Sequence, residues 1–393
     1  MSHAMKRARA RGGLGDKVRS WWDGLPRAGQ WAFGVPIAAV LILMTMYPPP
    51  LINTPNTNFA LVMAQVTMLS LVAIGLNVVV GQAGLLDLGY VGFYAIGAYT
   101  VAMLTSPNSP WHKGGIFDSG WAWLACVPLA VLITSISGLI LGTPTLRLRG
   151  DYLAIVTLGF GEIVRLLADN LRDITRGSAG LASIAYPVIG VSDEKPNGLF
   201  SAGNVQGPVS AGVAWFVAGL ILVVAVLIIV GNLERSRVGR AWVAIREDED
   251  AAEIMGVPTF KFKLWAFVIG AAIGGLSGAL YAGQVQFVSP EKFNVINSML
   301  FLVAVIIGGS GNKLGVIVGA FVIVYLPNRL MGVKVGDATL GDYKYLFFGL
   351  ALVVLMIFRP QGMFPVRQKL LSYSRKVHLA IVGSRREKAQ VNQ

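Results

Sequence analysis

Long runs of apolar residues without charged side chains occupy most of the chain. A bilayer core of about 30 Å is crossed by roughly 20 apolar residues in a helix, and many of the runs approach that length, although several are short or interrupted by glycine. The pattern predicts an all-α polytopic transmembrane bundle of about ten spans with glycine-broken helices. The spans are expected near residues 31–47, 59–80, 87–104, 120–141, 151–168, 211–231, 264–285, 296–309, 314–329 and 344–358.

Composition and charge favour a membrane protein over a soluble or nucleic-acid-binding one. Of all residues 54% are hydrophobic and 13% are charged, against about 25% charged in an ordinary soluble domain. The net charge of +13 is concentrated at the two ends of the chain, which flank a nearly neutral middle. Basic segments beside spans stay in the cytoplasm, and two cytoplasmic ends require an even number of spans. We therefore expect basic cytoplasmic tails at 1–29 and 359–393 around a transmembrane domain at 30–358.

Side chains that could support catalysis or bind a metal are scarce. Cys126 is the single cysteine, which excludes a disulfide framework and a thiolate metal cluster. His3, His112 and His378 do not cluster, which argues against zinc sites and histidine-based triads. No nucleotide-binding loop is present. The sequence therefore predicts no catalytic residue, no metal and no cofactor in this chain, so any energy source must lie in another protein.

Two long polar segments separate the apolar runs. With the N-terminus inside, residues 232–263 face the cytoplasm and carry six basic and six acidic residues. Their apolar residues, from Val238 to Val257, follow a helical period that Pro258 ends. This pattern predicts a pair of short amphipathic helices. Residues 169–210 face outward, where they either dock an external partner or form a solvated linker.

Glycines and polar residues interrupt the apolar stretch at residues 81–89. Backbone without helical hydrogen bonds is tolerated at membrane depth only beside protein or a water-filled cavity. The segment is therefore either a broken helix beside a solute pathway, with Asn77 and Gln82 offering amide groups, or a site of close helix packing. Residues 80–84 and 307–311 share a similar glycine pattern, which suggests two related halves of the kind many transporters have.

Ionisable residues within the predicted spans are candidates for function, because charges inside a membrane are costly. Asp87 follows the glycine-rich segment. Glu162 and Arg165 are three residues apart, so they can pair on one helix face. Two interpretations of this pair stay open, a self-neutralised pair in the bundle interior and a proton relay.

The inner segment also carries three motifs in series. Ser236-Arg237-Val238-Gly239-Arg240 is followed by Ala244-Ile245-Arg246-Glu247 and by Ala251-Ala252-Glu253-Ile254-Met255-Gly256. This series resembles the ATPase-coupling segment of LivM-like permease subunits of branched-chain amino acid ABC importers. Further resemblance over residues 59–330 is carried by Gly75-Leu76-Asn77, Gly81-Gln82-Ala83-Gly84, Gly97-Ala98-Tyr99, Leu146 to Leu158, Thr175 to Leu181 and Ile307-Gly308-Gly309-Ser310-Gly311.

The sequence departs from the family pattern at three positions. Asp87 and Tyr90 stand where the family is expected to have Ser and, shortly after it, His. Arg176 replaces the usual Gly or Asn. These departures bear on the particular solute and leave the class unchanged.

The resemblance implies a pore-forming permease subunit in the bacterial plasma (inner) membrane with both termini in the cytoplasm. Its partners would be a second homologous permease, two cytoplasmic ATPase subunits that bind ATP and Mg²⁺, and an extracytoplasmic solute-binding protein. Residues carried over from the family fall into two groups. The ATPase-coupling group is Arg237, Gly239, Arg240, Arg246, Glu247 and Gly256, and the solute-pathway group is Asn77, Gln82 and Thr157.

Import of leucine, isoleucine and valine is the leading functional prediction. An ABC importer of urea or short amides is the alternative within the same class, because both kinds of solute need only amides, carbonyls and a few polar side chains. A proton-driven secondary transporter that uses Asp87 and Glu162 is a second alternative. A membrane scaffold that recruits cytoplasmic proteins is a third, but it would leave the glycine-broken segments without a purpose.

Overall fold

The computed structural model describes residues 27–358 except 51, 55–56, 113–119, 149, 192–196, 202, 205–209, 332–333 and 336–337. The predicted basic tails lie outside the described residues, apart from residues 27–29, which begin the first described helix.

The described chain is almost entirely helical, as predicted. The longer helices are α3 (Arg27–Met46), α4 (Phe59–Leu76), α5 (Tyr90–Thr105), α6 (Ala122–Thr145), α7 (Asp151–Asn170), α9 (Ala211–Arg235), α12 (Thr259–Val285), α13 (Val295–Gly308), α14 (Lys313–Leu330) and α15 (Lys344–Phe358). Shorter elements are the π-helical turn η1 (Asn77–Gln82), α8 (Arg172–Thr175), η3 (Gly177–Ala179), α10 (Arg237–Glu247), α11 (Glu249–Ile254), η4 (Pro290–Phe293) and η5 (Leu340–Tyr343). Two antiparallel pairs of short strands are β1 (Leu181–Ala182) with β2 (Phe287–Val288) and β3 (Lys334–Val335) with β4 (Ala338–Thr339).

A helix lies at each predicted span position, and five of the helices in the described residues are long and apolar enough to cross a membrane. These five are α4 continued by η1, α6, α9, α12 and α14. Shorter apolar helices are α5, α13 and residues 344–354 of α15. Helix α7 has 20 residues but carries Asp151, Glu162, Arg165 and Asp169, so its polarity sets it apart from the five.

Helix α12 lies at the centre of the bundle and contacts α4, α5 and α6. A Cβ atom on Gly275 would lie 2.1 Å from the Thr134 hydroxyl of α6, and one on Gly278 would lie 2.1 Å from the Tyr94 carbonyl oxygen of α5. Backbones can approach this closely only where side chains are small. The glycines of α12 therefore allow the neighbouring helices to pack closely against it.

Helix α4 is buried on nearly all sides, between α9, α12 and α14. Its residues are apolar all round, which is typical of a helix surrounded by others. The α4–α9 and α4–α14 contacts bring two helices from later in the chain beside α4.

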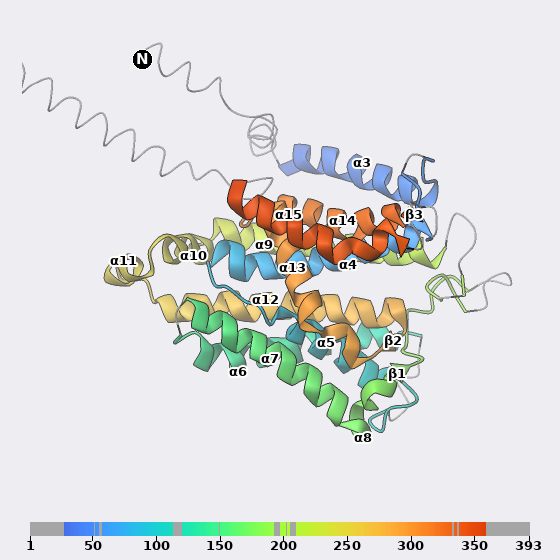
Figure 1. Ribbon diagram of the computed structural model, residues 1–393, viewed down its shortest axis with the longest axis horizontal. Coiled ribbons are helices and arrows are strands. Elements are labelled where there is room, and N and C mark those ends of the chain that lie inside the picture. Colours follow the sequence, from blue (N-terminus) through green and yellow to red (C-terminus); the bar gives the residue numbers. More distant parts are fainter. Residues whose placement is uncertain are drawn as a thin grey trace, which may run out of the picture.

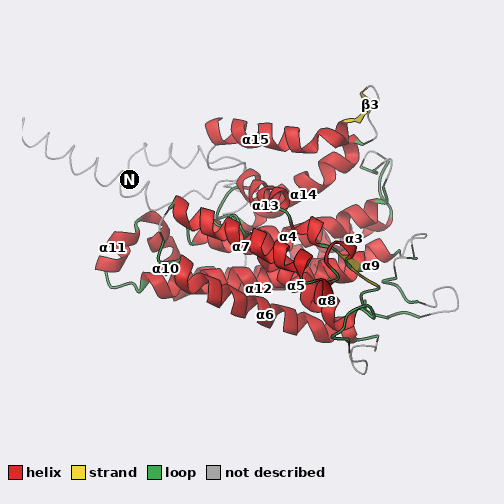
Figure 2. Ribbon diagram, turned by 60° about the horizontal axis from the view of Figure 1, so that its bottom comes forward, coloured by secondary structure: helices red, strands yellow, loops and turns green. Residues whose placement is uncertain are grey.

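The connecting segments lie at two opposite ends of the bundle (Figures 1 and 2). Helices α10 and α11 extend beyond one end, while α8 and the strand pairs lie at the other. The predicted outer segment 169–210 is partly structured, because it contains α8, η3 and β1, and the Ser106 hydroxyl donates a 2.6 Å hydrogen bond to the Ala182 carbonyl oxygen. The pairing of β1 with β2 joins this outer segment to the connection between α12 and α13.

Candidate functional site

The chain leaves its helical path at the glycine-rich segment after α4. The π-helical turn η1 ends at Gln82, Gly84 adopts a φ of 74°, and residues 83–89 run without regular structure to α5. Such π-helical turns occur often at functional sites. The helix is broken here, and a Cβ atom on Gly89 would lie 1.7 Å from the Thr157 carbonyl oxygen, so the segment is also a site of close packing. Its place beside a solute pathway stays a prediction.

The second glycine-rich segment breaks the path between α13 and α14 in a similar way. Gly309 and Gly311 have φ values of 101° and 85°, a conformation that only glycine adopts without strain. Asn312 then caps α14 by accepting a hydrogen bond from the Leu314 N–H at 3.2 Å. A sharp reversal between two helices is the result.

These two glycine-rich segments lie in contact. The Gly311 N–H donates a 2.7 Å hydrogen bond to Asn77 Oδ1, and Asn77 is fully buried. A Cβ atom on Gly81 would lie 2.4 Å from the Gly311 nitrogen. The similarity between residues 80–84 and 307–311 therefore corresponds to two segments that meet in the structure.

Charged side chains of α9, α10 and α14 bond to the two glycine-rich segments or to one another at the end of the bundle that carries α10. Glu234 lies in the last turn of α9. One of its carboxylate oxygens accepts a 2.7 Å hydrogen bond from Gln82 Nε2, and the other forms a 2.7 Å ion pair with Lys313 Nζ. Arg246 of α10 donates a hydrogen bond to the Gly81 carbonyl oxygen. We call the set Asn77, Gly81, Gln82, Glu234, Arg246, Gly311 and Lys313 the polar junction.

The predicted pair of amphipathic helices is present as α10 and α11, which only Asp248 separates. Ser236 caps α10 by accepting the Val238 N–H at 3.1 Å, and Asp248 caps α11 by accepting the Ala251 N–H at 3.0 Å. A Cβ atom on Gly239 would lie 2.4 Å from the Glu234 carbonyl oxygen, so this glycine lets α10 fold back against the end of α9.

Helices α10 and α11 are held to the start of α12. Trp242 is fully buried, and its indole N–H donates a 2.8 Å hydrogen bond to the Phe262 carbonyl oxygen. Lys263 is only 4% exposed and forms an ion pair with Glu249 of α11. Gly256, with a φ of 83°, ends α11 and turns the chain toward α12. The two short helices are thus attached to the central helix of the bundle.

The surface of α10 and α11 that faces away from the bundle combines charge with exposed apolar groups. Arg237, Arg240 and Glu247 are exposed. Ile254 is 85% exposed and Met255 is 82% exposed. Exposed apolar side chains rimmed by charge are typical of a protein interaction site. We call this set the cytoplasmic docking surface, after the side that the sequence predicts for it.

The six residues predicted for ATPase coupling therefore separate into three groups. Arg237, Arg240 and Glu247 lie on the docking surface. Gly239 and Gly256 shape the turns of the helix pair, while Arg246 bonds to the glycine-broken segment. Glu234 and Lys313 were not predicted as site residues, since 79 positions separate them and no local pattern connects them.

The predicted pathway residues also separate. Asn77 and Gln82 belong to the polar junction, whereas Thr157 lies on α7 and its hydroxyl accepts a 3.1 Å hydrogen bond from the Leu88 N–H. Asp87 is 1% exposed and accepts a 2.9 Å hydrogen bond from the Gly89 N–H at Oδ1. Thr157 and Asp87 thus both hold the non-helical segment in place. The Ser298 hydroxyl, which was not predicted, donates to the Leu88 carbonyl oxygen.

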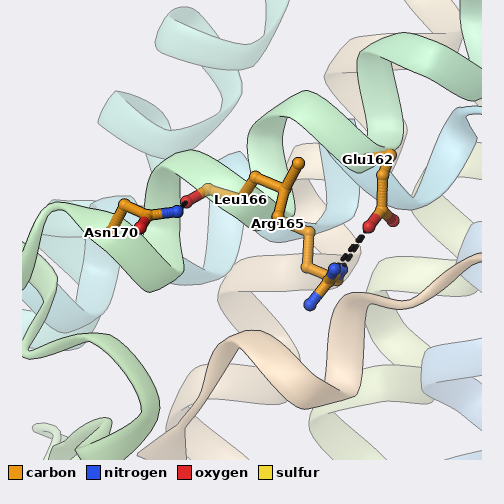
Figure 3. Close-up of polar contacts among 4 residues, drawn as sticks. All are labelled: Glu162, Arg165, Leu166 and Asn170. Carbon is orange, nitrogen blue, oxygen red and sulfur yellow. Dashed lines mark hydrogen bonds and ion pairs between the residues drawn. The ribbon is translucent and has the colours of Figure 1, made fainter.

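Glu162 and Arg165 form the predicted ion pair on α7, where both side chains point toward one another (Figure 3). The guanidinium Nε donates to Glu162 Oε1 at 2.9 Å. Their side chains are 33% and 25% exposed, so the pair lies at the surface of this chain's own bundle. Among the described residues, no cluster of three or more His, Cys, Asp or Glu side chains is suited to hold a metal ion.

Comparison with known proteins agrees with this architecture. Residues 58–356 match the family model described as "Branched-chain amino acid transport system / permease component". The chain is 41% identical over 317 residues to the high-affinity branched-chain amino acid transport system permease protein LivM of Salmonella typhimurium, covering 78% of this chain and 70% of the relative, and equally so to LivM of Escherichia coli. It is 26% identical over 301 residues to LivH of Escherichia coli, covering 75% of this chain and 90% of the relative. No solved structure gives a significant match.

The family match covers most of the chain, and it includes all five long apolar helices. The protein is a multi-pass membrane transport subunit rather than an enzyme. By this match and by its likeness to LivM, the chain belongs to the family of permease components of branched-chain amino acid transport systems.

Proposed function

We propose that this chain is one of two related membrane subunits of an ATP-driven importer of leucine, isoleucine and valine. Its similarity to both LivM and LivH supports a pairing with a second permease of the same family. Separate ATPase subunits bind ATP and Mg²⁺ and supply the energy, and an external binding protein delivers the solute.

Ten helices cross the membrane in this proposal, namely α3, α4 with η1, α5, α6, α7, α9, α12, α13, α14 and α15. Their order alternates between the two ends of the bundle, which leaves α10 and α11 at one end and the β1–β2 pair at the other. An even number of crossings places both termini on the side of α10 and α11. This side is the cytoplasm, because the basic residues of the sequence are concentrated at its two ends.

The cytoplasmic docking surface carries this proposal. Ile254 and Met255 are exposed at the end of α11, and Arg237 and Arg240 are exposed on α10, so the projection offers both apolar and basic side chains to another protein. Such a projection suits a partner protein that pushes on it. Because Trp242 and Lys263 attach the helix pair to α12, a displacement of the docking surface moves the central helix as well.

The polar junction provides a route from this surface into the bundle. A movement of α10 acts through Arg246 on the Gly81 carbonyl, and a movement of α9 acts through Glu234 on Gln82 and Lys313. The two glycine-broken segments lie directly beyond these bonds. Irregular backbone can rearrange with fewer lost hydrogen bonds than a helix, so these segments are where the ATP-driven movement opens and closes the solute pathway.

Copurification of the ATPase subunits tests the docking surface. In the assembled complex, Ile254→Asp or Arg240→Glu is expected to reduce the recovered ATPase at least about tenfold, a loss of about 1.4 kcal/mol of binding free energy. Lys292→Glu, a charge reversal at an exposed site of the opposite end, is the matched control and should retain the ATPase. Full recovery of ATPase with both docking-surface variants would refute the assignment.

The solute is tested through the copurified binding protein. Titration with leucine, isoleucine and valine is expected to show saturable binding, and urea and acetamide are expected to show none. If the binding protein bound only urea or a short amide, the importer would be assigned to those solutes instead.

A further inference from the structure

Helix α7 is attached to the bundle along one face only. Leu153, Ala154, Thr157, Gly161 and Ala168 are its buried residues. The opposite face forms a continuous exposed stripe with helical spacing. Its members are Tyr152, Ile155, Val156, Ile163, Leu166 and Leu167.

The Glu162–Arg165 pair lies along the edge of this stripe, near the middle of the helix. Glu162 is roughly 16 Å from the start of α7, at 1.5 Å per residue. Ionisable side chains at that depth are expensive against lipid and are usually covered by protein or water. The pair uses only Glu162 Oε1, and no described residue bonds to Glu162 Oε2 or to Arg165 Nη1. The second carboxylate oxygen of Glu162 and the Nη1 group of Arg165 therefore remain available to a further polar group.

Gly159 gives a second, independent indication on the same side of α7. A Cβ atom there would meet nothing within 4 Å beyond the nearby backbone of its own helix, so packing inside the described chain does not require glycine. Glycine in a helix interior is less favourable than alanine. In membrane proteins a glycine on an exposed face allows another helix to approach closely.

The neighbouring helix α6 provides the contrast. Its exposed residues include Leu132, Ile136, Leu139 and Ile140, and the helix has no charged side chain. Such a face is suited to lipid, and it needs no protein cover. The exposed faces of α6 and α7 therefore have different surroundings.

We propose that the exposed face of α7, from Ile155 to Leu166, packs against the second permease subunit of the importer. Glu162 and Arg165 pair there with a polar side chain of that subunit, and Gly159 receives the closest approach of its helix. The free acceptor and donor of the pair supply the charge complementarity, which suits a protein helix and not a lipid chain. This inference rests on the two-permease arrangement proposed above, since related subunits pair around a shared axis through corresponding surfaces.

Photo-crosslinking in the assembled complex tests this interface. The photoreactive residue p-benzoylphenylalanine replaces Ile163 on α7 or, as the matched control, Ile140 on α6, and both native side chains are exposed. We expect an adduct from position 163 whose peptides come from a distinct chain of the same permease family, and lipid adducts alone from position 140. Lipid adducts alone from position 163, or adducts with a second copy of this chain, would overturn the proposal.

Bulky substitutions give a second readout that does not depend on crosslinking. Gly159→Trp is expected to reduce recovery of the second permease at least about tenfold, whereas Ile140→Trp leaves it unchanged. Equal recovery with both variants would overturn the interface. If the unmodified chain recovers ATPases but no second permease, the two-permease arrangement itself fails, which is distinguishable from a misplaced interface within an intact complex.

Discussion

The amide N–H of Gly311 donates a 2.7 Å hydrogen bond to the side-chain oxygen of Asn77, although 234 positions separate the two residues. This bond joins the two breaks in the helical path at their point of contact. Both residues lie in the polar junction, where α9, α10 and α14 also meet through Glu234, Arg246 and Lys313. In the proposed coupling route, the junction is where movement at the docking surface reaches both breaks together.

Removing the acceptor at Asn77 tests this bond. Asn77→Leu is similar in size but leaves the partly buried Gly311 N–H without its acceptor, so the free energy of unfolding should fall by about 1–3 kcal/mol. Thermal unfolding of the purified chain in detergent measures the loss, and ATP-driven leucine uptake should fall with it. Asn170→Leu is the control, because the exposed Asn170 side chain bonds only to the Leu166 carbonyl of its own helix (Figure 3). Equal stability of the two variants would contradict the prediction.

Close approach at Gly81 leads to a separate prediction. Its added Cβ would overlap the Gly311 nitrogen and the Asn77 side chain, and overpacking of this kind costs about 1–3 kcal/mol. Gly81→Ala should therefore lower the melting temperature. Gly349→Ala on α15 introduces the same methyl group into open space and should be neutral or stabilise by about 0.5–1 kcal/mol. A Gly81→Ala variant as stable as Gly349→Ala would show that the two segments are farther apart.

Much of this fold follows from local sequence patterns. The span expected at 59–80 corresponds to α4 and η1, and the periodicity of residues 238–257 predicts α10 and α11 correctly. Both patterns repeat over one or two helical turns, so the sequence displays them directly. The span expected at 264–285 lies within α12, which begins earlier at Thr259, since residues 232–263 were predicted to form the polar cytoplasmic segment. In the structure, Lys263 is buried within α12 and neutralised by Glu249.

Contacts between distant segments account for most of what the sequence did not reveal. The Glu162–Arg165 pair was predicted from its spacing, but its exposure depends on which side of α7 meets the neighbouring helices. Likewise, in the sequence Glu234 is one of several charged residues in a polar segment. Only the fold brings Lys313 and Gln82 into contact with it. The sequence identifies side chains that are able to interact, but the packing of the helices determines which of them come into contact.

The Glu234–Lys313 ion pair should matter more for transport than for stability. Both side chains are partly exposed, at 29% and 26%, and pairs of that kind contribute about 0.2–1 kcal/mol. Lys313→Met should therefore change the melting temperature little, yet reduce ATP-driven uptake because α14 no longer follows α9. The ATPase should still copurify, in contrast to the result expected for Ile254→Asp. Normal uptake by Lys313→Met would exclude this link from the coupling route.

Replacing Glu249 and replacing Lys263 should lower the stability of the protein by different amounts, although the two residues form one ion pair. Glu249→Gln leaves the ammonium of Lys263, which is 4% exposed, without its anionic partner, and an uncompensated buried charge costs about 1–3 kcal/mol or more. Lys263→Met replaces that charge with an apolar chain of similar length and leaves Glu249 able to reach water, so its effect should be smaller. The double variant should recover most of the stability lost in Glu249→Gln, since no buried charge remains. Melting temperatures and the rate of limited proteolysis at α11 measure these differences, and a Lys263→Met variant less stable than Glu249→Gln would show that the pair does not attach α11 to α12.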